Sequence, residues 1–147
     1  MTGERPVVSL DLPAERSSPG AARAVLMQLA RTCRSVRLEE AEIAELCVVL
    51  HEACTNVLEH SLGFDRERRV RVEFHRLDAG LRIVLEDDGP PYALPRREPP
   101  EPDELRERGY GLHIMRSWSD HLHLERDGRV NRLTIYRAYR VESGGRR

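Results

Sequence analysis

The chain has 147 residues, with 24 basic and 25 acidic side chains and a formal net charge of -1. This length fits one compact domain whose hydrophobic core needs no disulfide or metal for support. All the basic residues are arginines, which excludes mechanisms that depend on the lysine of a P-loop, of the protein-kinase fold or of a pyridoxal phosphate Schiff base. The balanced charge provides no general attraction for nucleic acid or an anionic membrane, so we expect neither as a direct partner.

The cysteines and the N-terminal region predict a cytoplasmic protein. The three cysteines, Cys33, Cys47 and Cys54, form no C-x-x-C pair. Cys47 and Cys54 lie seven residues apart in a helical pattern, where a thiol usually fills space in a core. The N-terminal region has no apolar signal core, and no apolar run approaches the roughly 18 residues of a membrane span. We therefore expect reduced thiols and a location in the cytoplasm.

The first half of the chain predicts one strand and two helices. Residues 6–12 alternate apolar and polar side chains, which is typical of a short strand. The Ser-Ser-Pro run at 17–19 predicts a helix start with a capping hydroxyl beside a first-turn proline. A longer helix is predicted over 39–61, because apolar residues recur there every three or four positions, and Gly63 provides a left-handed end.

The second half predicts two hairpins separated by an insertion. The expected elements are, in chain order, strands 69–77 and 81–86 with a tight turn at 78–80, a helix at 109–118, and strands 121–125 and 132–139 around a turn at 127–128. Six of the nine prolines fall within 90–102, and such a long insertion without periodicity is more often a functional lid than an accident. We place this lid at about 90–108 and expect a frayed tail at 142–147.

These elements predict a single α+β domain over residues 1–147. Hairpins dominate the order of elements and crossovers are few, which favours a mixed, mostly antiparallel sheet. With helices packed on one face of that sheet, the expected architecture is a two-layer α/β sandwich.

A row of polar side chains is predicted on the 39–61 helix. Glu52, Asn56 and His60 recur every four residues and therefore share one side of it. Valines flank Glu52, and a carboxylate in partly apolar surroundings is a suitable general base. The amide oxygen of Asn56 is a neutral hard ligand that suits a Mg²⁺ ion whose other ligands are phosphate and water. The alternative is an ordinary solvated face of an amphipathic helix.

Two further segments have features of a nucleotide site. The strand at 81–86 leads into Asp-Asp-Gly at 87–89, and a buried aspartate at such a strand end can accept a hydrogen bond from the exocyclic amine of adenine. The Gly-Tyr-Gly run at 109–111 begins the last helix, where free backbone N–H groups favour phosphate, and Arg106 and Arg108 add positive charge. Taken singly, the first segment fits an ordinary turn and the second a hinge.

In this order, the three segments and the lid resemble the Bergerat ATP-binding fold. That superfamily includes histidine kinase catalytic domains, gyrase-type ATPases, Hsp90 chaperones and small bacterial anti-sigma factor serine kinases. The resemblance extends from about Val7 to Tyr139 and is greatest to the anti-sigma factor serine kinases. It depends on the E-A-x-T-N-x-x-x-H run at 52–60 and on the E-R-G-Y-G-L-x-I-M run at 107–115, which is followed by Asp120.

The resemblance implies ATP and Mg²⁺ as cofactors and a role for each residue of the three segments. Glu52 would deprotonate the acceptor serine, and Asn56 would ligate Mg²⁺. Asp87 would bind the adenine amino group, and Gly89 would let the backbone approach the base. The residues expected to contact the phosphates are Arg106, Arg108, Gly109, Gly111 and Leu112.

The resemblance also implies the partners. The substrate would be a small STAS-type anti-anti-sigma factor, phosphorylated on serine or threonine. A homodimer of this chain would sequester a sigma factor when it is not engaged with that substrate.

Two departures from the family pattern leave a second interpretation open. Pro91 occupies the place of the second glycine in the usual Asp-x-Gly-x-Gly, so the start of the lid loses one N–H donor and becomes stiffer. Glu107 separates Arg106 from Arg108, where one arginine is expected next to the second glycine motif. The alternative is a catalytically weak or inactive module of the same fold that sequesters partners. A nucleic-acid binder is disfavoured, because only 5% of the residues are aromatic and bases would have few rings to stack on.

Overall fold

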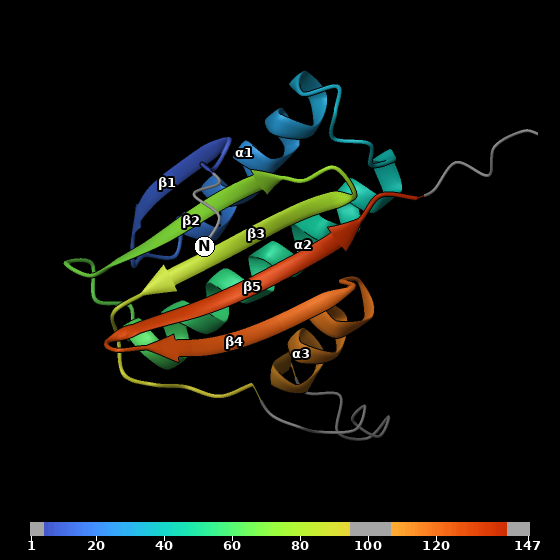
Figure 1. Cartoon of the computed structure of the whole chain (residues 1–147). Helices are drawn as coiled ribbons and strands as arrows, with labels where there is room; N and C mark the ends of the chain where they lie inside the picture. The colour runs from blue at the N-terminus through green and yellow to red at the C-terminus, as the bar shows by residue number, and fades with distance from the viewer. Residues whose placement is uncertain (1–4, 95–106, 141–147) are drawn as a thin grey trace, which may run out of the picture.

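The computed structural model describes residues 5–94 and 107–140 (Figure 1). Within them, the elements in chain order are β1 (Val8–Pro13), α1 (Ser18–Thr32), α2 (Glu40–Val57), the π-helix η1 (Leu58–Leu62), β2 (Arg69–Arg76), β3 (Gly80–Asp87), α3 (Glu107–Ser117), β4 (His121–Asp127) and β5 (Val130–Ala138). The strands form one sheet, and the helices lie on one of its faces, which confirms the predicted α+β two-layer sandwich. None of these described helices combines the length and hydropathy needed to cross a lipid bilayer.

The sheet has the strand order β1-β2-β3-β5-β4, and each neighbouring pair is antiparallel. Both predicted hairpins are confirmed. At the first, the N–H of Leu77 donates to the carbonyl oxygen of Gly80 at 2.8 Å. At the second, Gly128 has a φ of 61°, a left-handed conformation that glycine adopts without strain. The central pair, β3 with β5, joins two strands between which α3 and β4 lie in the sequence.

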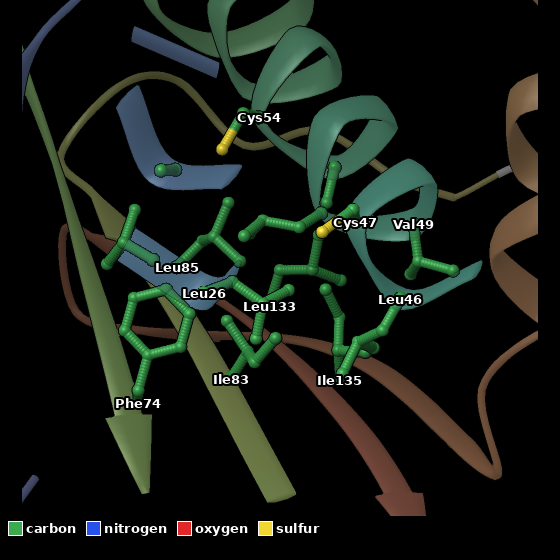
Figure 2. Packing of buried hydrophobic residues seen from close by; sticks show 14 of the residues in the cluster. Leu26, Leu46, Cys47, Val49, Cys54, Phe74, Ile83, Leu85, Leu133 and Ile135 are labelled. Carbon is green, nitrogen blue, oxygen red and sulfur yellow. The ribbon is translucent and has the colours of Figure 1, made fainter. Parts of the chain in front are cut away.

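The core lies between the inner face of the sheet and one stripe of α2 (Figure 2). Its fully buried side chains include Phe74, Ile83, Leu85, Leu133 and Ile135 from the sheet and Leu26, Leu46 and Leu50 from the helices. Each such side chain stabilises the fold by roughly 1.5–3 kcal/mol relative to exposure. Cys47 and Cys54 are buried free thiols in this cluster, as predicted. Burial raises the pKa of the Cys54 thiol to about 12, so it stays protonated and acts as an apolar group.

The start of α1 differs from the prediction in its hydrogen bonds. The helix does begin at the Ser-Ser-Pro run, but the predicted capping hydroxyl is wrong. The Ser17 hydroxyl donates to the Glu15 carboxylate at 3.1 Å, and the buried Ser18 hydroxyl donates to the carbonyl oxygen of Pro13 at 2.6 Å. Both hydroxyls therefore stabilise the tight connection from β1, and such local side-chain hydrogen bonds compete with capping of the helix.

The end of α2 widens into a π-helical turn. The predicted helix over 39–61 is confirmed as α2 followed by η1, and Gly63 ends it with a φ of 58° and an N–H that donates to Leu58. Ser61 and Leu62 in this turn are both buried. Such turns are frequent at functional sites, and here the turn brings Ser61 against the end of β3.

Candidate functional site

Asp87 is a buried carboxylate at the end of β3, with 4% of its surface exposed. One of its oxygens, Oδ1, accepts three hydrogen bonds: from the backbone N–H of Gly89 at 2.9 Å, from the side-chain amide of Asn131 at 3.1 Å and from the Ser61 hydroxyl. The other oxygen, Oδ2, is buried and has no hydrogen-bond partner among the described residues. The carboxylate is thus fixed through one oxygen, and the other is left to accept a hydrogen bond from a ligand.

Asn131 and Arg126 hold this carboxylate in place, and neither was singled out from the sequence. Asn131 lies opposite Asp87 in the β3–β5 register and is 1% exposed. Its amide nitrogen also reaches the carbonyl oxygens of Gly89 at 3.2 Å and Pro90 at 3.0 Å. Arg126 donates from Nη1 to the amide oxygen of Asn131 at 2.9 Å and to the carbonyl oxygen of Gly89 at 3.0 Å. Arg126 therefore fixes the orientation of the amide, with its NH₂ group toward Asp87.

Gly89 is required by close contact with the helical layer. A Cβ at this position would lie 2.1 Å from the Ser61 hydroxyl oxygen and 2.6 Å from the Ser61 carbonyl oxygen. The resemblance implies that Gly89 would let the backbone approach a bound base. The structure shows another close approach at Gly89, to η1. We call Ser61, Asp87, Gly89, Asn131 and Arg126 the Asp87 cluster.

Substitution of Gly89 by alanine is expected to destabilise the protein by about 1–3 kcal/mol, because the new methyl group displaces the end of β3 from η1. Denaturant unfolding measures this change. The matched control is Gly20→Ala in α1, where the nearest atom to a new Cβ is 3.9 Å away. That variant should gain about 0.5–1 kcal/mol from helix propensity. Equal stability of the Gly89 variant and the unmodified protein would contradict the close contact.

Glu52 and Asn56 lie one turn apart on α2, and both are half-buried. Val49 and Ala53, which border them on the same helix, are completely buried. Glu52 therefore has apolar neighbours on one side and solvent on the other. His60 is exposed, and its imidazole lies 3.8 Å from the Glu59 carboxylate.

Helix α3 brings the third segment to the same end of the molecule. Arg137 of β5 donates to the carbonyl oxygen of Trp118, just after α3, at 2.8 Å, and to the carboxylate of Glu45 near the start of α2 at 3.2 Å. Because α2 and α3 also contact each other, α3 runs antiparallel to α2 and its first turn points toward the half of α2 that carries Asn56 (Figure 1). The three segments chosen from the sequence therefore lie around one end of the two layers.

The predicted phosphate residues are only partly described. Arg106 lies outside the described residues, with most of the lid and the tail. Arg108, Gly109 and Gly111 lie in α3, which the structure describes from Glu107 to Ser117. Leu112 is buried, so its side chain is part of the core.

A cavity of ≈ 860 Å³ opens beside the Asp87 cluster. Its walls come from residues 92–94, α3, β4 and Asn131, and its volume is in the range of sites that hold small molecules and cofactors. Among the described residues, no group of three histidine, cysteine or acidic side chains is arranged to hold a metal ion. Glu52 and Asn56, which the structure describes, are not among the residues that line this cavity. A metal bound by Asn56 would take its other ligands from a bound phosphate and from water.

The comparison with protein families decides the identity of the fold. A family model described as the histidine kinase-like ATPase domain matches residues 16–137. The chain belongs to the histidine kinase-like ATPase family. The match includes α2, the end of β3 and α3, which carry the three segments of the site.

Within this family, the chain is similar to proteins named serine-protein kinase RsbW. The relative from Bacillus licheniformis is 29% identical over 97 residues, which cover 60% of this chain and 61% of that protein. The relative from Bacillus subtilis is 27% identical over 92 residues, covering 57% and 58%. The matches to these two span about three-fifths of their length. A third relative, from Bacillus velezensis, is 24% identical over 131 residues, covering 84% and 80%.

Solved structures support the same fold. The RsbU and RsbW domains of a Mycobacterium tuberculosis protein align with a TM-score of 0.62 at 17% identity, covering 89% of this chain and 31% of that one. A chain of the SiaB–SiaC complex from Pseudomonas aeruginosa aligns with a TM-score of 0.62 at 15% identity, covering 90% of both.

Proposed function

We propose that this protein is an ATP-dependent serine/threonine protein kinase that acts as an anti-sigma factor. It phosphorylates a STAS-type anti-anti-sigma factor and, as a cytoplasmic homodimer, sequesters a sigma factor by partner switching. The observation that carries the ATP site is the buried Oδ2 of Asp87, which has no hydrogen-bond partner among residues 5–94 and 107–140 and needs a donor such as the adenine amino group. The similarity to RsbW serine-protein kinases supports the choice of reaction.

Each predicted residue takes one role in this reaction. ATP, when bound, supplies the transferred phosphoryl group, and Mg²⁺ reduces its negative charge. Asp87 fixes the base, Asn56 supplies an oxygen ligand to the ion, and the N-terminal turn of α3, with Arg106 or Arg108, binds phosphate. Glu52 accepts the proton of the acceptor hydroxyl. Its half-exposed position on α2 suits this role, because the hydroxyl belongs to a second protein that must reach it from solvent.

A second candidate function is a partner-sequestering module that binds ATP and transfers phosphate weakly or not at all. The start of the lid favours it. Pro90 and Pro91 restrict the backbone there, and the carbonyl oxygen of Pro90 is tied to Asn131 at 3.0 Å. If transfer requires this segment to move, the proline pair and this hydrogen bond both oppose the movement.

The two functions are separated by measuring binding and transfer on the same sample. Calorimetric titration with ATP and Mg²⁺ should show one site per chain. The protein is then incubated with labelled ATP, Mg²⁺ and a purified STAS-domain protein whose gene lies near the gene for this chain. This acceptor should become labelled on serine or threonine. Binding without labelling would favour the sequestering module. No ATP binding would contradict both functions.

A further inference from the structure

Tyr92 has a buried hydroxyl group beside the Asp87 cluster. It follows Pro90 and Pro91, and its ring packs against the core cluster at the edge of the ≈ 860 Å³ cavity. The hydroxyl oxygen is buried and has no hydrogen-bond partner in the described part of the chain. Asp87 Oδ2 has the same status, so two of the buried polar atoms that lack a partner among the described residues lie in one region of the fold, where a ligand could satisfy both.

The backbone and the electrostatics place these two groups close together. The Asn131 amide that donates to Asp87 Oδ1 at 3.1 Å also donates to the carbonyl oxygen of Pro90 at 3.0 Å, two residues before Tyr92. Burial raises the pKa of the Tyr92 phenol, and the nearby carboxylate of Asp87 raises it further. The phenol therefore keeps its proton at neutral pH and is a hydrogen-bond donor in the same region as the acceptor of Asp87.

A ligand that satisfies both atoms must offer a donor and an acceptor side by side. The exocyclic amine and the ring nitrogen N1 of adenine are such a pair, on the edge that adenine uses for base pairing. We propose that Tyr92 is a specificity-determining residue whose hydroxyl donates to N1 of adenine, while the adenine amine donates to Asp87 Oδ2. This inference rests on the proposed ATP site and adds a second contact to the base.

This role of Tyr92 compensates for the departure at Pro91. A glycine at position 91 would offer a backbone N–H next to the base, and proline has none. In this chain the next residue instead provides a side-chain donor, whose half-buried ring packs against the core.

The test is a cycle of two proteins and two nucleotides, measured by calorimetry with Mg²⁺ present. Tyr92→Phe removes only the hydroxyl, and 1-deazaadenosine triphosphate replaces N1 of the base with C–H. We expect Tyr92→Phe to weaken ATP binding by about 5- to 30-fold, as for loss of one buried hydrogen bond. The unmodified protein should bind the analogue more weakly than it binds ATP, by a similar factor. The analogue should bind the unmodified protein and Tyr92→Phe with equal affinity.

Tyr139→Phe is the matched control, because the Tyr139 hydroxyl is also buried and unpaired among the described residues. Tyr139 follows the C-terminal end of β5, whereas Asn131 lies at the other end of that strand. ATP affinity should be unchanged in this variant, and thermal unfolding should show that both variants are folded.

Three results would overturn the role of Tyr92 while the ATP site stands. The first is an unchanged ATP affinity in Tyr92→Phe. The second is a higher ATP affinity in that variant, as expected if the hydroxyl only blocks the site. The third is that Tyr92→Phe loses affinity for ATP and for the analogue by the same factor. If the unmodified protein binds no ATP, the proposed function fails as well, so the two failures are distinguishable.

Discussion

Substitution of Glu52 by glutamine is expected to lower phosphoryl transfer by about 10²- to 10⁴-fold, the usual contribution of a positioned general base. Glutamine keeps the size and polarity of the side chain but does not accept the proton of the acceptor hydroxyl. ATP binding should be retained, because Asp87 and the first turn of α3, not Glu52, are assigned to the nucleotide. The rate of acceptor labelling and the calorimetric affinity for ATP, measured on the same preparation, check both statements.

Glu59→Gln is the matched control for this variant. Glu59 is an exposed carboxylate seven residues further along the same helical segment, beside His60. The substitution removes the same charge from the same helical segment without removing the assigned base, so transfer should continue at the unmodified rate. Equal transfer by the Glu52 variant and the unmodified protein would refute the assignment of the base.

Substitution of Asp87 by asparagine is expected to weaken ATP binding by roughly 10- to 150-fold, which corresponds to the 1.5–3 kcal/mol of a hydrogen bond to a charged group. Asparagine has one oxygen and one NH₂ group. If the NH₂ replaces Oδ2, it faces the adenine amine, and if it replaces Oδ1, it faces the donors of Gly89 and Asn131. Either orientation therefore places the new NH₂ group against another hydrogen-bond donor. Calorimetry measures the affinity, and thermal unfolding shows which orientation the variant adopts, since only the second also destabilises the fold.

Asp88→Asn controls for the loss of charge next to the site. Asp88 is exposed and accepts a surface hydrogen bond from Arg68 at 3.2 Å. Its substitution should leave the ATP affinity within about twofold, because exposed ion pairs contribute little. Unchanged affinity in Asp87→Asn would remove adenine from this site.

The elements of the fold were predictable because their signals are local. Gly63, the two hairpin turns and the apolar stripe of α2 each depend on a few neighbouring residues, and all are confirmed. The start of α1 was predicted less well. Its hydroxyls can either accept hydrogen bonds from the helix N–H groups or donate to the preceding segment, and only the path of the chain from β1 decides between the two.

The Asp87 cluster was only half predictable. The Asp-Asp-Gly run at 87–89 stands out in the sequence, but the partners of Asp87 come from η1 and β5. Asn131 is placed opposite Asp87 by the pairing of β3 with β5. Strands that are not joined by a hairpin give no short-range signal for their register. Ser61 and Tyr92 depend likewise on how the two layers pack.

The strand order has a consequence for how this protein meets other chains. In the part of the chain that the structure describes, β1 and β4 are the outer strands of the sheet. β1 is short and ends in Pro13, which has no N–H to offer to an added strand. β4 carries outward charged and imidazole side chains such as His123 and Glu125. Both margins therefore resist extension of the sheet by a foreign segment, so side chains on the helices, on the loops or on the sheet face that the helices leave uncovered are better suited than strand pairing to contact another chain.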